Sequence, residues 1–454
     1  MNSLYVICGL GLISLIAELA NFKKQLIPIF IVGILAAIGL AVMDWGTSLH
    51  YFSDMAIFDN VALSFSILIC ATAAFWFLIA NDYFHTETHI TDQAALVIFV
   101  MAGGVIMASF NNMAMLFLGI EILSLSLYAL AGSRKLNLFS NEAAFKYFLM
   151  GSFATGFLLM GIALVYGATG QFHLDKIAAS IAAQPELPGF FYAGVILIIV
   201  GMAFKISAVP FHFWAPDVYE GAPTLITSLM ATVVKTAAFA AFFRMVWYCF
   251  PAVEQTWLLP LQVITVATLV LANVTAVFQS KVKRMLAYSS VGHAGYILLA
   301  LTTGGTSSAG TIFFYLAAYS AATLIAFAIL NRLELATNFA EGSFNGLFKK
   351  SPFLAVAMTV SLLSMAGIPP LAGFFGKYLV FVQAISQGYV GLVVVAVITS
   401  LIGVYYYFGV IISMFFKEPA GGEIQVSSGL KLILSLLVLV LLAMGILPDL
   451  FLPL

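Results

Sequence analysis

Long apolar runs follow one another along almost the whole chain, separated by short polar connections. A membrane-spanning helix needs about 20 predominantly apolar residues. By that measure the pattern predicts about fourteen spans, at residues 3–21, 25–45, 60–82, 92–110, 112–133, 141–167, 189–210, 223–248, 257–279, 284–302, 309–331, 352–386, 390–416 and 430–450. We therefore expect an all-α polytopic membrane protein.

Proline interrupts two of these spans. Pro210 lies at the end of the seventh, and the twelfth is too long for one crossing and contains Pro369 and Pro370. Proline removes a backbone donor and clashes with the preceding helical turn, so helices 7 and 12 should be broken, the seventh at Pro210.

The two interrupted spans are five spans apart, and an odd offset reverses orientation in the membrane. The pattern therefore indicates inverted five-helix repeats, a feature of transport proteins. We expect four regions, which are helices 1–3 at 1–90, a first repeat (helices 4–8) at 91–250, a second repeat (helices 9–13) at 251–416, and helix 14 at 417–454.

Basic residues are distributed unequally between the two sets of connections. The connections after odd-numbered spans hold Lys23, Lys24, Arg134, Lys135, Lys281, Lys283, Arg284, Arg332, Lys349, Lys350, Lys417 and Lys431. The other set holds Lys176, with Arg244 near a span end. Because positively charged loops stay in the cytoplasm, the pattern places the odd connections there and both termini outside.

Composition supports a membrane protein and excludes several function classes. The chain is 63% hydrophobic and 8% charged, and its mean hydropathy is +1.10, more apolar surface than a soluble protein of 454 residues can bury. Its net charge of -1 offers no basic surface for nucleic acid. The three cysteines show no CxxC spacing, and the N-terminus lacks a basic region before its apolar run, which favours a retained first span over a signal peptide.

Charged residues inside the predicted spans are the main functional signal. Lys205, Lys235, Lys377 and Lys146 fall within spans, as does Glu121. Each charge near the bilayer centre costs about 2.5–3.5 kcal/mol, so packing alone does not explain them. At 1.5 Å per residue, Glu121 lies about 14 Å and Lys235 about 18 Å into their helices, near the membrane midplane. Lysines beside helix breaks at this depth indicate an ion or proton path.

Lys146 and the histidines keep two interpretations each. Lys146 is shallower, and Glu142 one turn earlier is a natural partner, so it either transfers protons or extends to the interface. His212, after the seventh span, and His293, in the tenth, are either proton relays or histidines satisfied by neighbouring helices. Polar groups precede His293 at Tyr288, Ser289 and Ser290.

Signals for cofactors are absent from the sequence. His85 and His89 have metal-like spacing, but they lie in a polar loop that we expect to be solvated. The chain has no phosphate-binding glycine loop, no cysteine cluster and no HExxH motif, so we expect no cofactor and no metal in this chain.

Six strings carry a resemblance that covers essentially the whole chain. They are FLGIEILSLSLYAL around Glu121, EAAFKYF around Lys146, FKISAVPFHFWAPDVYEGAP around Lys205, the TxxK ending at Lys235, KRMLAYSSVGHAGY around His293 and SMAGIPPLAGFFGKYLVF around Lys377. With these strings the chain resembles the N-type antiporter-like membrane subunits of proton-pumping NADH–quinone oxidoreductase, respiratory complex I.

The resemblance implies fourteen helices, two inverted five-helix bundles and proton transfer along a central hydrophilic axis. The residues that it assigns to proton transfer are Glu121, Lys205, Lys235, His293 and Lys377. The residues that we expect to assist this proton transfer are Lys146, His212, Tyr288, Ser289, Ser290, Pro210 and Pro369. Our hypothesis pairs Lys205 with Glu121 and passes the proton through Lys235 and His293 to Lys377.

The resemblance also implies partners and a location. NADH, FMN, iron–sulfur clusters and quinone would be bound by other subunits. The neighbours would be the antiporter-like M subunit, the small A/J/K-type subunits and lipid, with both termini on the periplasmic side of the inner membrane. The chain ends soon after its fourteenth span, leaving no room for the lateral helix of the L type, and has Lys377 where the M type typically has glutamate.

Three other functions remain open at this stage. A Mrp-type cation/proton antiporter subunit shares the lysine–glutamate set and the broken helices, although the DVYEGAP and YSSVGHAGY strings argue against it. A structural subunit that spaces its partners would tolerate apolar residues in place of the buried lysines. A channel is disfavoured because no ring-forming filter motif is present.

Overall fold

The computed structural model describes residues 2–19, 22, 25–84, 90–184, 186–337, 342–419 and 424–452. The chain forms two compact units. Unit 1 comprises Met1–Trp214 and Val233–Ile264, and unit 2 comprises Ala215–Thr232 and Thr265–Pro453. His85 and His89 lie outside the described residues.

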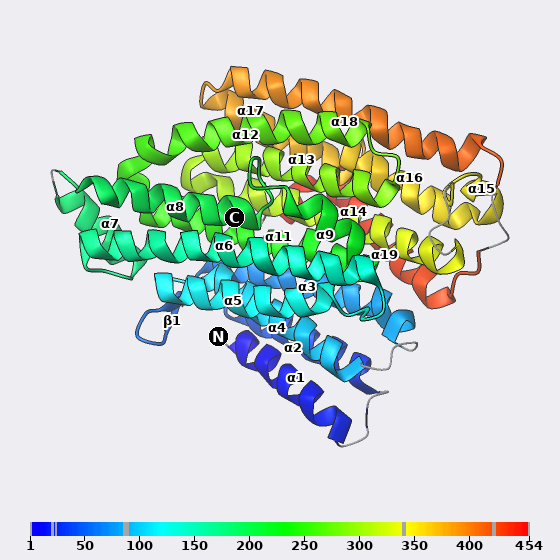
Figure 1. Ribbon diagram of the computed structural model, residues 1–454, viewed down its shortest axis with the longest axis horizontal. Helices are drawn as coiled ribbons and strands as arrows, with labels where there is room; N and C mark the ends of the chain where they lie inside the picture. Colours follow the sequence, from blue (N-terminus) through cyan, green and yellow to red (C-terminus); the bar gives the residue numbers. More distant parts are fainter. Residues whose placement is uncertain are drawn as a thin grey trace. The chain divides into compact units, whose positions relative to one another are not determined.

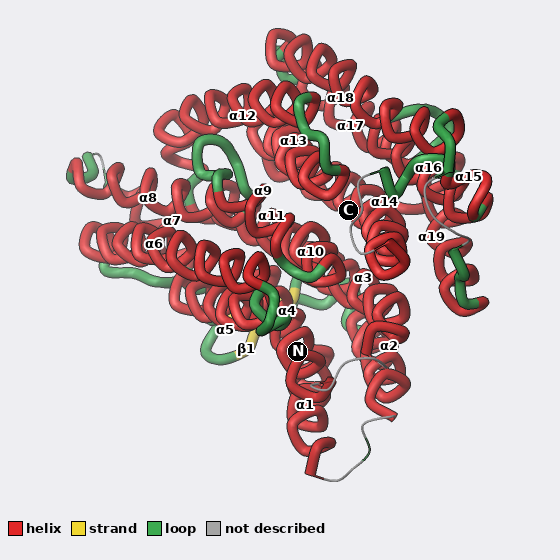
Figure 2. Tube along the Cα trace, turned by 45° about the vertical axis from the view of Figure 1, so that its right-hand side comes forward, coloured by secondary structure: helices red, strands yellow, loops and turns green. Residues whose placement is uncertain are grey.

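Unit 1 is a helical bundle with one small hairpin (Figures 1 and 2). Its helices are α1 (Asn2–Leu19), α2 (Leu26–Met43), α3 (Asn60–Phe84), α4 (Ile90–Ser109), α5 (Met113–Ala131), α6 (Leu138–Thr169), α7 (Leu174–Ala183), α8 (Gly189–Lys205) and α11 (Lys235–Arg244). Strands β1 (Leu49–Tyr51) and β2 (Ala56–Phe58) pair antiparallel, with Leu49 opposite Phe58.

Unit 2 is entirely helical among its described residues, apart from turns and loops. Its helices are α9 (Trp214–Gly221), α10 (Thr224–Leu229), α13 (Val282–Thr303), α14 (Ser308–Thr337), α15 (Leu347–Lys350), α16 (Pro352–Ala366), α17 (Ala372–Ser386), α18 (Val390–Phe416) and α19 (Ser428–Ile446). Helix α12 (Glu254–Val277) runs from unit 1 into unit 2.

The helices of both units have the length and composition of membrane spans. Eleven described helical segments are long and apolar enough to cross a bilayer. Four shorter apolar helices accompany them, at Asn2–Ala17, Gly189–Lys205, Pro352–Ala366 and Ala372–Ser386. The chain is therefore a predominantly helical, polytopic membrane-type protein.

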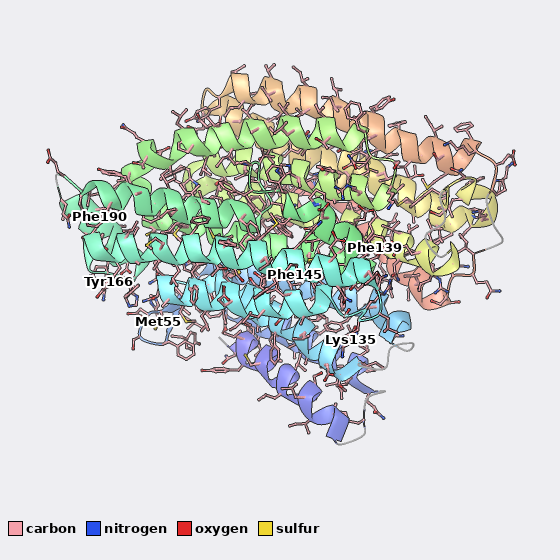
Figure 3. The ribbon with its side chains drawn as sticks, viewed as in Figure 1. Met55, Lys135, Phe139, Phe145, Tyr166 and Phe190 are labelled. Carbon is pink, nitrogen blue, oxygen red and sulfur yellow. The ribbon has the colours of Figure 1, made fainter. Side chains whose placement is uncertain are left out.

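Helix α6 presents large apolar side chains outward in unit 1. Phe139, Phe145 and Tyr166 spread along it and are 69%, 63% and 44% exposed (Figure 3). In water such a surface would be unfavourable, whereas hydrocarbon lipid tails solvate it. The exposed face of α6 therefore agrees with a membrane environment.

The first helix break differs from the predicted one. Helix α8 ends at Lys205, five residues before Pro210. Ser207 adopts a left-handed backbone conformation (φ 62°), which lets the Ala208 N–H donate to Ala203 C=O at 2.8 Å and the Ser207 N–H to Phe204 C=O at 3.0 Å. This is a Schellman closure. The expectation that Pro210 ends the helix was wrong, because backbone hydrogen bonds turn the chain before the proline is reached.

The second break, in the predicted twelfth span, closes in the same way. Helix α16 ends at Ala366, and Gly367 takes the left-handed conformation (φ 86°) that a residue without Cβ adopts readily. The Ile368 N–H donates to Leu363 C=O at 3.0 Å, and the Gly367 N–H donates to Ser364 C=O at 3.0 Å. Pro369 lies within the break, and helix α17 begins at Ala372. Each break contains a cis proline, Pro210 in the first and Pro370 in the second.

Three features were not predicted from the sequence. The hairpin β1–β2 and the short helix α7 lie in connections that were expected to be irregular. The predicted span 223–248 contains two π-helical turns, at Met230–Val234 and Met245–Cys249. Their extra residue per turn cannot be read from a uniformly apolar run, because apolarity does not distinguish helix types.

Candidate functional site

Lys205 of unit 1 is buried at the C-terminal end of α8. Its side chain is 5% exposed, and its Nζ donates to Ser124 Oγ of α5 at 2.5 Å. The partial negative charge of a helix C-terminus stabilises a cation there. The location therefore combines desolvation, which disfavours a charge, with the helix C-terminus and the Ser124 hydroxyl, which favour it.

Glu121 lies one turn before Ser124 on α5. Its charge acts on Lys205, while the direct hydrogen bond of the ammonium goes to Ser124. Ser124 was not predicted as a site residue. The spacing of three residues between it and Glu121 on one helix face could have indicated it.

Lys235 and His212 are the other two buried basic side chains that the sequence analysis assigned to this half of the path. Lys235 is the first residue of α11, directly after the π-helical turn Met230–Val234, and is 2% exposed. His212 follows Pro210 in the first break and is 9% exposed. No described residue gives its Nδ1 a hydrogen bond.

Lys146 forms an ion pair on α6. Its Nζ lies 2.7 Å from Glu142 Oε1, one turn earlier on α6, and the two side chains are 38% and 56% exposed. The expected pairing with Glu142 is confirmed. A partly exposed pair of this kind contributes little to stability.

His293 is the centre of a hydroxyl network in unit 2. Its Nδ1 lies 2.8 Å from Tyr315 Oη, and its Nε2 lies 3.2 Å from Tyr407 Oη. Tyr407 also hydrogen bonds Ser289, and Tyr319 donates to Ser290 Oγ at 2.8 Å. An imidazole contacted on both nitrogens can accept a proton on one and release it from the other.

A small cavity adjoins this histidine. Its lining includes His293, Tyr319, Ser364 and Gly373, so it extends to the break between α16 and α17. It offers about 10 Å³ to the centre of a water-sized sphere. A single water molecule needs about 10–15 Å³ by this measure and two or more polar partners, so the cavity is of the size for one water.

Lys377 lies on α17 and reaches back to the second break. Its Nζ donates to Ala366 C=O at 2.9 Å and to Ser400 Oγ at 2.8 Å, and the side chain is 6% exposed. The ammonium is 4.9 Å from the centre of the Tyr296 ring. Lys377 therefore binds at the C-terminal end of the helix that precedes the second break, where a cation is stabilised, whereas Lys205 is itself the last residue of the helix before the first break.

Tyr288 is not part of the His293 network. It is half-buried, with the Arg284 guanidinium 6.0 Å from the centre of its ring. Ser289 and Ser290, on the next positions, do reach the network. The string YSS therefore divides between two faces of α13, since successive residues of a helix are about 100° apart.

Arg284 belongs to a cluster of ion pairs at the start of α13. Its Nη1 lies 2.8 Å from Asp217 Oδ1 and 2.9 Å from Glu220 Oε2, and Lys281 Nζ lies 2.7 Å from Glu220 Oε1. Partial burial by itself raises the pKa of Glu220, but the hydrogen bonds and charges of Lys281 and Arg284 outweigh it and hold the pKa below its usual range. The cluster fastens α9, which follows the first break in the chain, to α13.

No group of three or more His, Cys, Asp or Glu side chains within the described ranges could hold a metal ion. The geometry is that of buried lysines, a histidine and hydroxyl groups connected by hydrogen bonds. Such groups can hold and pass protons.

Comparisons with known proteins agree with this chemistry. The family described as "NADH:quinone oxidoreductase/Mrp antiporter, TM" matches residues 110–403. NADH-quinone oxidoreductase subunit N from Cytophaga hutchinsonii is 42% identical over 457 residues, covering 100% of this chain and 99% of the relative.

Two solved structures share the fold. A chain of respiratory complex I from Thermus thermophilus is 33% identical, with a TM-score of 0.85 over 99% of this chain and 98% of the other. A chain of the Mrp complex from Dietzia sp. is 20% identical with a TM-score of 0.90, over 99% and 95%, a likeness of fold alone. Because family profile and full-length relative agree, the chain belongs to the subunit N family of NADH-quinone oxidoreductases.

Proposed function

We propose that this chain is the proton-translocating N-type membrane subunit of an NADH-quinone oxidoreductase, passing protons along a buried axis of Glu121, Lys205, Lys235, His293 and Lys377. The observation that carries this proposal is the burial of three lysines, Lys205, Lys235 and Lys377, at 5%, 2% and 6% exposure. Keeping three such charges in a membrane is costly and indicates a function.

Within unit 1, Lys205 is the first station. The Ser124 hydroxyl and the charge of Glu121 favour its protonated form, and burial opposes it. A small movement that weakens the influence of Glu121 would release the proton toward Lys235, and Lys235 would deliver it toward His293.

Within unit 2, the network contains the groups for the later steps. His293 receives the proton on one nitrogen and releases one from the other. Tyr296, whose ring centre is 6.1 Å from that of His293, lies under the Lys377 ammonium. A water molecule in the cavity at the second break would connect hydroxyl groups that do not touch directly.

The breaks themselves favour rearrangement. Trp214 Nε1 donates to Phe204 C=O at 3.1 Å in the first break, and Lys377 Nζ donates to Ala366 C=O in the second. In both, a side chain beyond the break donates to a carbonyl in the last turn of the preceding helix, where carbonyls lack intrahelical partners. His212, Pro210 and Pro369 would assist by keeping these segments open to water.

We propose fourteen spans, which are the eleven long segments, the helices Asn2–Ala17 and Gly189–Lys205, and one interrupted span formed by α16 and α17. The matching closures at Ser207 and Gly367 support two repeats, at 91–250 and 251–416, flanked by 1–90 and 417–454. The distribution of basic residues places both termini on the periplasmic side of a bacterial inner membrane.

The subunit takes part in the enzyme without carrying a redox centre. NADH, FMN, iron–sulfur clusters and quinone would be bound by other subunits, and the energy of quinone reduction would reach this chain through its neighbours. We propose the antiporter-like M subunit and the small A/J/K-type subunits as those neighbours. The exposed apolar faces, such as that of α6, would contact lipid or these partners.

The test is Lys377→Ala in the intact membrane complex, with assembly checked by native electrophoresis. We expect NADH-driven proton pumping to fall about tenfold or more, because removal of a proton-transfer group typically costs at least that much. Lys349→Ala, at an exposed lysine of unit 2, is the control and should pump normally. Normal pumping by an assembled Lys377→Ala complex would contradict the proposal.

A further inference from the structure

Lys283 is buried, although its place in a basic cluster predicts a solvated anchor. Its side chain is 8% exposed, whereas Lys281, two residues earlier, is 67% exposed. Its Nζ lies 3.6 Å from Glu334 Oε1 on α14, and the Glu334 side chain is 6% exposed. Sequence reasoning did not single out Glu334, which lies near the end of a predicted span.

The pair lies where three helix ends of unit 2 meet. Lys283 is the second residue of α13, and Glu334 is three residues from the end of α14. The second carboxylate oxygen of Glu334 accepts a hydrogen bond from Thr224, the first residue of α10. Lys283 Nζ also donates to Ala222 C=O at 2.8 Å, just before that helix begins.

This position is shallow but shielded from water. One turn of helix spans about 5.4 Å, so both charges are within about one turn of the solvated helix ends. The surface cluster of Lys281, Arg284 and Glu220 lies on the adjacent positions. Lys283 is therefore the first buried titratable residue on α13 that a proton coming from this side meets.

Stability alone is a poor explanation for such a pair. Desolvating two charges offsets most of their attraction, and apolar residues of similar volume often replace a buried ion pair without loss of stability. A buried lysine, unlike arginine, can lose its proton. The pair can therefore exist in more than one protonation state.

We propose that Lys283 and Glu334 form a further proton-transfer site, an additional point at which protons from cytoplasmic water enter the axis, at its His293 half. This inference rests on the proposed function. In the resting pair Lys283 carries a proton and Glu334 carries none. When Glu334 takes a proton from water, Lys283 loses the carboxylate that stabilises its charge and releases its own proton inward. The proton on Glu334 then moves to Lys283 and restores the pair, so one proton has entered and one has left.

Hydroxyl groups on the same helix continue the route inward. Ser290 is seven residues beyond Lys283 on α13, about 10 Å along the axis of the helix. The Ser290 hydroxyl forms hydrogen bonds with Tyr319 and with Tyr219 of α9. The ring of Tyr319 lies 4.8 Å from that of His293, centre to centre. The site thus leads to the network already described, with water needed for the first 10 Å or so.

Lys283→Arg tests the proposal in the intact membrane complex. Arginine keeps the positive charge and the ion pair but cannot be deprotonated in proteins. We expect normal assembly and a fall in NADH-driven proton pumping of about tenfold or more. Lys349→Arg is the matched control, since Lys349 forms an exposed pair with Glu418, and it should pump normally. Wild-type pumping by an assembled Lys283→Arg complex would overturn the inference.

A second variant covers the case in which arginine does not fit. The double substitution Lys283→Met/Glu334→Leu removes both charges together, so no unpaired charge is left behind. Assembly with pumping lost supports a proton-transfer site, and assembly with pumping retained refutes it. Lys377→Arg in the same assay distinguishes a failure of the proposed entry site from a failure of the proposed function. If Lys377→Arg loses pumping while the Lys283 variants keep it, only the entry site is wrong. If all of them pump normally, the proposed function fails as well.

Discussion

The ammonium of Lys377 lies 4.9 Å from the centre of the Tyr296 ring. The same tyrosine is one helical turn beyond His293 on α13, with its ring centre 6.1 Å from that of the imidazole. Tyr296 therefore contacts both titratable groups that the axis needs in unit 2. Its aromatic face stabilises a cation, while its hydroxyl lies 3.4 Å from Thr399 Oγ1.

Removing the ring of Tyr296 should impair proton pumping more than removing its hydroxyl. Tyr296→Leu takes away a buried cation–π contact worth about 2 kcal/mol to the charged form of Lys377. Tyr296→Phe keeps the aromatic face. We expect the leucine variant to pump several times more slowly than the phenylalanine variant, measured as NADH-driven acidification in membrane vesicles. Equal rates for the two variants would show that the ring face does not matter.

Ser124→Ala should weaken pumping through Lys205 while leaving the fold intact. The substitution removes the 2.5 Å hydrogen bond that the ammonium makes, and a hydrogen bond to a charged group is worth about 1.5–3 kcal/mol. Ser126→Ala, on the same helix, is a control because its hydroxyl bonds only the Ile122 carbonyl of its own helix among the hydrogen bonds observed. The measurement is the pumping rate of each assembled complex. A Ser124→Ala complex that pumps as fast as the control would remove Ser124 from the site.

Glu220 should make stability depend on pH. The pKa of its carboxyl is lower in the folded protein than in the unfolded chain, because Lys281 and Arg284 outweigh the effect of burial. The stabilisation is therefore present above the usual glutamate pKa and is lost as the pH falls through the lower, folded value. Glu220→Gln should lower the thermal unfolding temperature at pH 7, and the difference from wild type should shrink in acid. A difference that is the same at pH 7 and pH 3 would contradict the ion-pair explanation.

Gly445 should be essential for packing of α19 against the second break. A Cβ at this position would lie 1.9 Å from the Pro370 carbonyl oxygen, which backbone cannot accommodate without moving. Gly445→Ala should lower the unfolding temperature or prevent assembly. Gly429→Ala is the matched control, because nothing lies within 4 Å of a Cβ there on the same helix. If both alanine variants are equally stable, α19 does not pack as described.

Much of the fold could be predicted from the sequence. The length of each apolar run and the unequal distribution of basic residues between the connections indicate membrane spans without knowledge of distant contacts. The long helices and the two interrupted spans were read from these signals. Pro210 was misread as the end of α8, because the actual closure depends on Ser207 in a left-handed conformation, which residue type does not reveal. The hairpin β1–β2 was missed because three-residue strands carry no detectable alternation.

The site was predictable where a charge stood in an apolar run and not where it depended on a distant partner. Lys205, Lys235 and Lys377 stood out for that reason, and all three are buried. Ser124, Tyr315 and Tyr407 are ordinary residues for a membrane helix, and only packing brings them to Lys205 or His293. Lys283 was placed in a cytoplasmic connection together with Lys281 and Arg284, and its burial depends on a partner, Glu334, that is 51 positions away.

The most direct test of the account is Lys205→Ala in membranes that contain the intact complex. NADH-driven proton pumping and quinone reduction would be measured together, with assembly checked on a native gel. We expect an assembled complex in which both activities fall, because Lys205 is a station of a pump coupled to the redox reaction. Assembly with both activities unchanged would show that the buried lysine is structural and that protons follow another path.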